Sequence, residues 1–172
     1  MSSRVYIGLG GNLGDVCQTL TAALNAINQL PHTAVESVSS FYQSVPLGPT
    51  DQPDFINAVA LLRTAQSPLS LLRLLQQIEL DFGRERKRHW GERTLDLDIL
   101  SFDNLQQFDP VLTLPHPGIC EREFVVLPLA EIAADLVLPD GTMVATLANT
   151  LGADPERPLR IVAPAPDLSR GI

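Results

Sequence analysis

An acidic strand pattern directly follows a cluster of basic residues, and this arrangement constrains the chain more than any other feature. Polar and apolar residues alternate over residues 94–100, as in a β-strand with one buried face. Asp96 and Asp98 therefore share a face, with Cα atoms roughly 6.6 Å apart. Two carboxylates at this spacing can converge on one or two divalent cations. Hard oxygen ligands favour Mg²⁺, which takes its remaining ligands from water and substrate phosphates.

The basic cluster at 84–93 holds five of the chain's twelve Lys and Arg residues, although the formal net charge is -8. Four of the five are Arg, whose planar guanidinium can bind phosphate oxygens through two parallel hydrogen bonds. A lone acidic pair is more often the solvated face of an edge strand, and any single basic residue here could be a solvated loop charge. Because the two features adjoin, we interpret them as a metal site beside a polyphosphate.

Composition indicates one globular domain of enzyme size. A chain of 172 residues with 45% hydrophobic and 19% charged residues can bury a sizeable core. The start of the chain has no apolar signal core, and no stretch approaches eighteen apolar residues, so we expect a cytoplasmic protein without a membrane partner. Cys17 and Cys120 lack metal-ligand spacing and predict neither a disulfide framework nor a zinc site. The acidic balance argues against broad nucleic-acid binding.

Hydrophobic periodicity predicts strands at 5–9, 34–43 and 55–63 and helices over 16–27, 67–82 and 121–134. Residues 46–53 are so rich in proline and turn formers that we expect a loop. Four prolines follow Gly152 and indicate an extended or mobile segment. We therefore predict one domain at 1–152 and a proline-rich C-terminal tail at 153–172.

Three nucleotide-binding motifs are incomplete or absent. Gly8, Gly10 and Gly11 partly match a dinucleotide fingerprint, but Leu13 occupies the third glycine position. The tripeptide at 81–83 matches a protein-kinase motif, yet it ends a helix and no kinase catalytic loop precedes it. No phosphate-binding P-loop sequence occurs. ATP binding would therefore depend on arginines and on carboxylate-held metal.

Six blocks of the chain resemble, in order, those of the 6-hydroxymethyl-7,8-dihydropterin pyrophosphokinases. They lie at 6–14, 40–42, 46–49, 52–57, 93–98 and 114–117, and the resemblance extends over residues 4–150. It implies transfer of pyrophosphate from ATP to the hydroxymethyl group of a reduced pterin, giving AMP in folate biosynthesis. It also implies a single α+β domain of ferredoxin-like topology, with helices flanking a central antiparallel sheet.

The same resemblance implies which residues form the site. Asp96 and Asp98 would hold two Mg²⁺ ions, and Arg84 and Arg93 would be catalytic residues that stabilise charge on the transferred phosphates. The residues expected at ATP are Gln76, Glu79, Arg84, Arg86, Trp90, Arg93, Ile99, Thr113, His116 and Arg122. The residues expected at the pterin are Ser44, Leu47, Phe55, Asn57 and Phe124, with the ring stacked between the two phenylalanines.

Several of these residues have a plainer interpretation. Either phenylalanine could pack in the core, and Gln76 and Glu79 could form the wet side of an amphipathic helix. His116 could be a loop histidine that caps a carbonyl. The basic loop is one residue shorter than in typical family members, which leaves open whether Arg88 or His89 makes the outer phosphate contact.

Two other functions remain in competition with the kinase. A non-catalytic nucleotide or polyphosphate sensor would use the same arginines and carboxylates to bind ligand without transferring a group. A protein-interaction module would recruit partners through its acidic surface and proline-rich tail. For the kinase we expect ATP and a reduced pterin as substrates and a monomeric protein. The sequence leaves open whether it contacts other folate enzymes.

Overall fold

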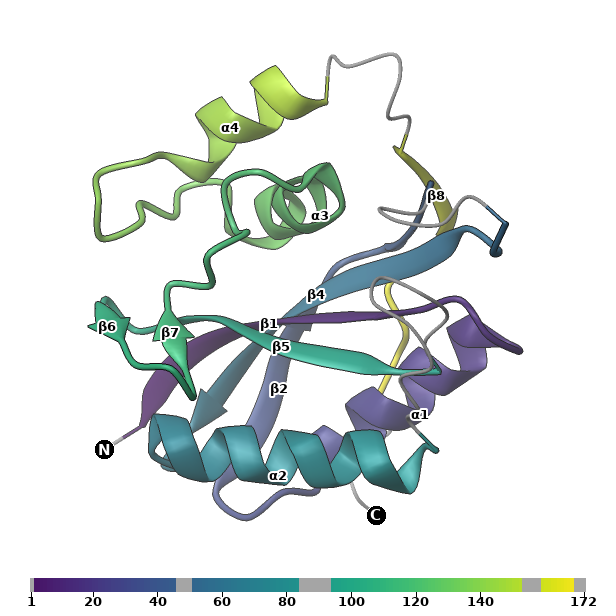
Figure 1. Cartoon of the computed structure of the whole chain (residues 1–172), viewed down its shortest axis with the longest axis horizontal. Helices are drawn as coiled ribbons and strands as arrows, with labels where there is room; N and C mark the ends of the chain where they lie inside the picture. The colour runs from purple at the N-terminus through teal and green to yellow at the C-terminus, as the bar shows by residue number, and fades with distance from the viewer. Residues whose placement is uncertain (1, 46–50, 84–93, 153–158, 169–172) are drawn as a thin grey trace.

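A six-stranded antiparallel sheet forms the centre of the molecule in the computed structural model, which describes residues 2–45, 51–83, 94–152 and 159–168 (Figure 1). Its strands are β1 (Ser3–Gly11), β2 (Thr33–Val38), β3 (Phe41–Ser44), β4 (Phe55–Thr64), β5 (Asp96–Phe102) and β8 (Leu159–Ala163). The strand order is β5-β1-β4-β3-β8, and β2 pairs with the later part of β4. A separate hairpin joins β6 (Gln107–Phe108) to β7 (Thr113–Leu114).

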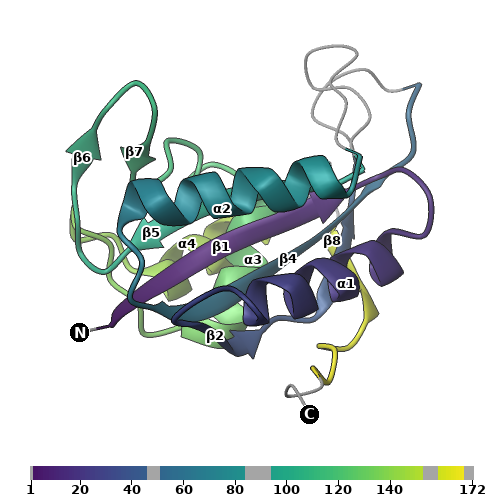
Figure 2. The ribbon, with the colours of Figure 1, turned by 90° about the horizontal axis from the view of Figure 1, so that it is seen from below.

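Helices cover both faces of the sheet, as Figures 1 and 2 show. The helices α1 (Val16–Asn28) and α2 (Pro68–Asp81) lie on one face, and α3 (Glu123–Ala133) and α4 (Val144–Leu151) lie on the other. The series β1-α1-β2-β4-α2-β5 follows the β-α-β-β-α-β order of ferredoxin-like folds. The predicted α+β class with a central antiparallel sheet flanked by helices is therefore confirmed.

Local sequence explains where the first two helices begin. The side chain of Asp15 accepts a hydrogen bond from the backbone N–H of Gln18 at 3.2 Å and caps α1. Ser67 caps α2 in the same way, through Ser70 N at 3.3 Å, and Pro68 supplies the fixed φ angle of the first turn. Among the described residues no helix is both long and apolar enough to cross a membrane.

Strand alternation divides the core into two layers. Val5, Ile7 and Leu9 of β1 are buried under α1 and α2, together with apolar residues of β4 and β5. Tyr6 of β1 faces the other way and packs in a second cluster with Leu129 of α3. Each fully buried Leu or Ile contributes about 1.5–3 kcal/mol, so the two layers fix the positions of the strands.

Two predicted elements differ from the structure. The strand expected over 34–43 is interrupted at Ser39 and Ser40, because the Ser39 hydroxyl accepts a hydrogen bond from Val59 N (2.9 Å) and donates one to Ser40 O (2.8 Å). The residues on either side form β2 and β3, which pair with different parts of β4. The helix predicted over 121–134 is slightly shorter, at Glu123–Ala133.

Part of the proline-rich segment joins the sheet. Residues Leu159–Ala163 form β8, which pairs with β3, and Leu168 packs against the first core layer. The composition of this segment indicates an extended chain but does not identify its partner strand. The division into a domain at 1–152 and a tail at 153–172 remains a prediction.

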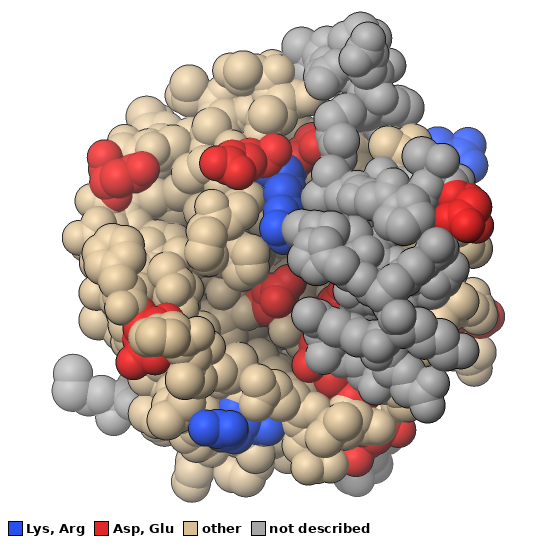
Figure 3. All heavy atoms as spheres, viewed as in Figure 1, with Lys and Arg blue, Asp and Glu red and all other residues tan. Residues whose placement is uncertain are grey.

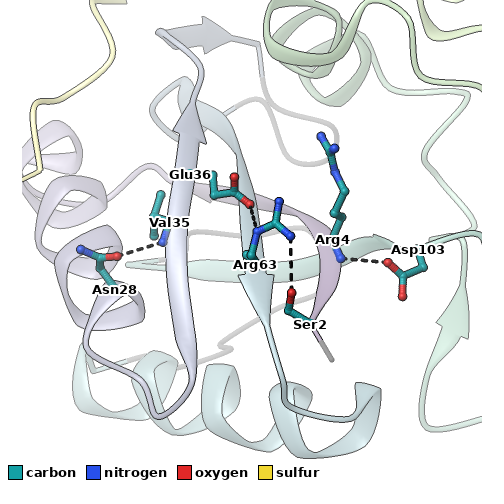
Figure 4. A network of polar contacts seen from close by, with 7 residues as sticks. All are labelled: Ser2, Arg4, Asn28, Val35, Glu36, Arg63 and Asp103. Carbon is teal, nitrogen blue, oxygen red and sulfur yellow. Dashed lines mark hydrogen bonds and ion pairs between the residues drawn. The ribbon is translucent and has the colours of Figure 1, made fainter.

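Polar contacts join the elements at the end of the sheet where β1 begins (Figure 4). Arg63 of β4 forms an ion pair with Glu36 of β2, with Nε and Oε1 2.7 Å apart. The backbone N–H of Arg4 donates to the Asp103 carboxylate at 2.8 Å. The sequence-predicted site residues of the sheet lie toward the opposite ends of these strands.

Candidate functional site

A row of paired residues crosses the sheet on the face that carries α3. Gly10 of β1 lies between Asp96 of β5 and Asn57 of β4, and Gly8 lies between Asp98 and Val59. Paired residues of neighbouring strands project to the same face. Because Gly10 has no side chain, the Asn57 amide lies directly against it, and a Cβ at Gly10 would be 2.6 Å from Asn57 Oδ1.

The predicted alternation along the acidic strand is confirmed. Leu97 and Ile99 are buried in the first core layer, whereas Asp98 is exposed and Asp96 half-buried on the face that carries α3. Among the described residues there is no cluster of three or more His, Cys, Asp and Glu that would enclose a metal. A pair of carboxylates fits Mg²⁺, which keeps several ligand positions for water and phosphate oxygens.

A buried glutamate of α2 supports the acidic strand. Glu79 is 7% exposed, and its Oε2 accepts a hydrogen bond from Leu97 N at 2.8 Å. In the part of the chain that the structure describes, β5 is an edge strand of the sheet, so this N–H has no neighbouring strand to bond with there. The interpretation of Glu79 as part of a wet helix face is therefore wrong. Gln76, three residues earlier, is exposed.

His116 lies beside the acidic strand with its ring orientation defined. Its Nδ1 accepts a hydrogen bond from Gly118 N at 3.0 Å, and its backbone N–H donates to Leu100 O at 2.8 Å. The neutral ring therefore carries its proton on Nε2, where it can donate to a ligand. Burial lowers the pKa of His116, the Asp98 charge raises it, and the Arg122 charge lowers it.

Arg122 lies immediately before α3 and passes close to the backbone of Gly118. A Cβ at Gly118 would lie 2.6 Å from Arg122 Nε, so only glycine leaves room for this side chain. The Arg122 guanidinium carbon lies 5.9 Å from the centre of the Phe124 ring, within the range of a cation–π contact. These contacts place a cation next to His116 and Phe124.

On the opposite side of the row, Asn57 is bonded to Ser44. Its side-chain nitrogen donates to Ser44 Oγ at 2.8 Å, and both residues are buried. Phe55 lies two residues before Asn57 on β4 and pairs with Ser44 of β3 in the sheet. Strand alternation places Phe55 and Asn57 on one face, so an aromatic ring and a fixed amide group lie side by side.

Both ends of the loop between β3 and β4 are fixed by side-chain amides. Asn12 Nδ2 donates to Gln52 Oε1 at 3.0 Å and to Pro53 O at 2.9 Å. Gln43 Nε2 donates to Asp54 Oδ2 at 3.0 Å. The sequence interpretation gave no role to Asn12 or Gln43, because their partners lie in another segment. Asn12 follows β1 directly and is buried in the structure, a property that the sequence does not display.

Figure 3 shows in space-filling form the side of the molecule seen in Figure 1, with α3 and α4 in the upper part and α2 in the lower part. Basic and acidic side chains lie close together near its middle, between the helices above and the strand edge below, and acidic side chains predominate elsewhere on the described surface. Charges of both signs are therefore present on this side of the described surface. The basic cluster at 84–93 lies outside the described surface.

The structure describes most but not all of the site residues that the sequence predicts. Ile99 is 3% exposed with its side chain in the first core layer, and Thr113 of β7 donates from its hydroxyl to Asp109 O at 3.1 Å. The residues that lie outside the described part of the chain are Leu47, Arg84, Arg86, Arg88, His89, Trp90 and Arg93.

Comparison with known proteins points to one enzyme family. The family model of 7,8-dihydro-6-hydroxymethylpterin-pyrophosphokinase (HPPK) matches residues 6–134. The 2-amino-4-hydroxy-6-hydroxymethyldihydropteridine pyrophosphokinase of Haemophilus influenzae is 54% identical over 144 residues, which cover 84% of this chain and 90% of that protein. The enzyme of the same description from Pseudomonas aeruginosa is 51% identical over 141 residues, covering 82% of this chain and 87% of the relative.

Solved structures show the same fold at low sequence identity. The crystal structure of Plasmodium falciparum HPPK-DHPS wild type superimposes with a TM-score of 0.69 at 14% identity, over 88% of this chain. The match covers 45% of the solved chain, so this protein spans less than half of that length. The extent of the family match and the identity to the bacterial enzymes show that the chain belongs to the 7,8-dihydro-6-hydroxymethylpterin-pyrophosphokinase family.

Proposed function

We propose that this protein transfers pyrophosphate from ATP to the hydroxymethyl group of 6-hydroxymethyl-7,8-dihydropterin, in folate biosynthesis. The observation that carries the proposal is the row Asp96–Gly10–Asn57 with Asp98 beside it, so that two carboxylates and an amide bonded to Ser44 lie on one face of the sheet. The hydroxymethyl oxygen forms a bond to the β-phosphorus. The bond from that phosphorus to the oxygen of the α-phosphate breaks, AMP leaves, and the hydroxyl proton is released.

Asp96 and Asp98 would hold Mg²⁺, with two ions expected when ATP is bound. Bound metal would neutralise charge on the phosphates and polarise the phosphorus under attack. Asp98 is exposed and can reach a ligand from solvent, while half-buried Asp96 is held in the sheet by its pairing with Gly10. The reaction needs no covalent nucleophile, because positioning and charge stabilisation supply the catalysis.

The nucleotide would lie along the outer edge of β5. Alternate residues of a strand direct their backbone groups to the same edge, so those of Ile99 lie on the edge where Glu79 bonds Leu97 N. Ile99 would therefore contact adenosine through its backbone, beside Gln76, Glu79 and Thr113. The Nε2–H of His116 and the guanidinium of Arg122 would donate to phosphate oxygens. Sequence resemblance alone supports roles for Arg84, Arg86, Trp90 and Arg93.

The pterin would lie on the other side of Gly10. A fused heterocycle requires an apolar stacking surface together with fixed donors and acceptors at its edge. Phe55 and Phe124 would supply the stacking surface, and Asn57, held by Ser44, would contact the pyrimidine edge. Leu47 belongs to the same proposal on sequence resemblance alone. The cytoplasmic location and the monomeric state stay predictions.

Association with another folate enzyme is a further expectation. The solved Plasmodium falciparum protein is named HPPK-DHPS, and a relative from Lactococcus lactis is described as "Bifunctional protein FolKE". These names support the idea that this activity is coupled to others of the pathway. For this chain we propose such contact without assigning a surface.

Product analysis separates the kinase from a sensor. The purified protein is incubated with ATP, Mg²⁺ and the pterin, and the nucleotides are resolved by chromatography against a reaction that lacks pterin. The proposal predicts AMP only when pterin and metal are both present. ADP would indicate ordinary phosphoryl transfer, and tight ATP binding without turnover would indicate the sensor. Either result would contradict the proposal.

A further inference from the structure

We infer that β8 supports the pterin site and that Arg160 is a positioning residue for pterin binding. The family model ends at residue 134, so this strand lies beyond the part of the chain that it matches. The inference rests on the proposed function, because it takes Phe55, Ser44 and Asn57 as pterin contacts. It assigns a role to a segment that sequence composition describes only as an extended tail.

The first argument concerns the strand that β8 supports. β3 has four residues, and three of them pair with β4. On its other side, β3 pairs with β8 from Phe41 to Ser44. Without β8, β3 would be a very short edge strand, and such strands open locally at low free-energy cost. The stability of Ser44 at the end of β3 therefore depends on β8.

The second argument is a relay of hydrogen bonds from Arg160 to the start of β4. Arg160 Nε and Nη2 donate to Gln43 Oε1 at 3.2 and 2.9 Å. The amide nitrogen of Gln43 then donates to Asp54 Oδ2 at 3.0 Å. The cation at one end and the carboxylate at the other fix the orientation of the amide and polarise both of its bonds.

The relay ends next to two proposed pterin contacts. Asp54 precedes Phe55 directly, and Gln43 precedes Ser44, whose hydroxyl accepts the hydrogen bond of Asn57 at 2.8 Å. Arg160 therefore acts at both ends of the loop between β3 and β4. Because the relay does not reach β5, α2 or His116, its loss is expected to affect the pterin and to leave ATP binding unchanged.

Steady-state kinetics of full-length Arg160→Ala test the inference. We expect KM for the pterin to rise about three- to tenfold, as for loss of one charge-assisted bond, with kcat and KM for ATP within about twofold of wild type. Arg160→Lys keeps one donor and should recover most of the loss. Gln43→Ala should also raise KM for the pterin. In the double variant of Arg160→Ala and Gln43→Ala this KM should be no higher than in the stronger single variant, because both substitutions remove the same relay.

Arg63→Ala is the matched control. Arg63 is another exposed strand arginine with a side-chain partner, Glu36, but it lies at the far end of the sheet (Figure 4). It should leave both KM values unchanged. An Arg160→Ala enzyme with unchanged pterin KM, or with KM for ATP raised equally, would overturn the inference.

Calorimetric titration with the pterin, in the presence of a non-hydrolysable ATP analogue, separates this inference from the proposed function. If wild type binds pterin and Arg160→Ala binds it more weakly, β8 has the role inferred even when no AMP is formed, and only the proposed reaction is contradicted. Equal pterin affinities of the two proteins would refute the role of Arg160 and would not contradict the proposed reaction. A wild-type chain that binds no pterin overturns both.

Discussion

The carboxylate of Glu79 accepts a hydrogen bond from the backbone N–H of Leu97, the residue between Asp96 and Asp98. This contact ties α2 to the edge strand at the point where the two aspartates project. A buried carboxylate is costly unless it is hydrogen-bonded, and an edge N–H in a buried position needs an acceptor. Each group therefore satisfies a requirement of the other, and the strand is held where metal would bind.

Replacing Glu79 should affect both stability and catalysis. Glu79→Ala leaves Leu97 N without its acceptor, and we expect the free energy of unfolding to fall by about 1–3 kcal/mol. Catalytic activity should fall as well, because the strand that carries the two aspartates is less well held. Glu79→Gln keeps an acceptor oxygen and should be closer to wild type. Urea unfolding measures the difference, with exposed Gln77→Ala as the control on the same helix. A Glu79→Ala protein as stable as Gln77→Ala would contradict this role.

The position of Gly10 should be sensitive to the addition of a single methyl group. A Cβ at this position would lie 2.6 Å from Asn57 Oδ1, so Gly10→Ala must displace the amide that we assign to the pterin. We expect KM for the pterin to rise by about tenfold or more, because a fixed polar contact is lost. Gly8→Ala is the packing control, since its Cβ would meet Leu100 at an ordinary 3.6 Å. Unchanged pterin binding in Gly10→Ala would remove Asn57 from the site.

Lower pH should destabilise the protein through His116. Burial lowers its pKa below the ordinary 6.5, Asp98 opposes the shift, and Arg122 adds to it. The unfolded chain therefore binds this proton more tightly, so its stabilising contribution is present above pH 6.5 and is lost as the pH falls through the folded pKa. The free energy of unfolding of His116→Gln should fall less than that of wild type between about pH 7 and about pH 5.

Direct titration by NMR checks the cause. In the protein without metal or nucleotide, Arg122→Gln should raise the pKa of His116, because a neighbouring positive charge is removed. A wild-type pKa above 6.5 would show that the Asp98 charge outweighs burial, and the assignment of a neutral donor would fail.

The contact between Tyr42 and Glu131 should contribute to the docking of α3. Tyr42 Oη donates to Glu131 Oε1 at 2.6 Å, and the same carboxylate accepts from Ser40. Burial, this bond and the Glu131 charge all raise the pKa of Tyr42. Tyr42→Phe should lower the free energy of unfolding by about 1.5–3 kcal/mol, the range for hydrogen bonds to charged groups.

Tyr6→Phe is the control for that substitution. Tyr6 is buried like Tyr42, and it packs in the second core layer. Within the described residues, no side-chain hydrogen bond of the Tyr6 hydroxyl is seen. Thermal unfolding followed by circular dichroism should show a smaller loss for Tyr6→Phe. Equal losses would mean that the Glu131 contact contributes nothing beyond packing.

The helix α4 and the strands β6, β7 and β8 were not predicted from the sequence. Local periodicity was sufficient to predict β1, β4, β5, the helices α1, α2 and α3, and the shared face of Asp96 and Asp98. These features depend on side chains a few residues apart, which the sequence displays directly. The burial of Glu79 could not be predicted in this way, because its partner Leu97 lies 18 residues away on another element. The split at Ser39 depends in the same way on Val59 N.

The part of the site that we propose for the pterin was predictable only in part. Phe55 and Asn57 alternate along one strand, so their common face follows from the sequence. The hydrogen bond from Asn57 to Ser44 depends on the register of β3 against β4, and the support from Arg160 depends on the pairing of β8. Proline-rich composition indicates an extended segment but contains no information about which strand edge it will join.

The fate of the β-phosphorus tests the central claim most directly. ATP labelled with ³²P at the β-phosphate is incubated with the protein, Mg²⁺ and 6-hydroxymethyl-7,8-dihydropterin, and the products are separated by chromatography. The label should appear in the pterin product in equal amount to the AMP formed, and Asp98→Ala should abolish this transfer while keeping the fold. Label that remains in ADP, or undiminished transfer by Asp98→Ala, would contradict pyrophosphoryl transfer at this site.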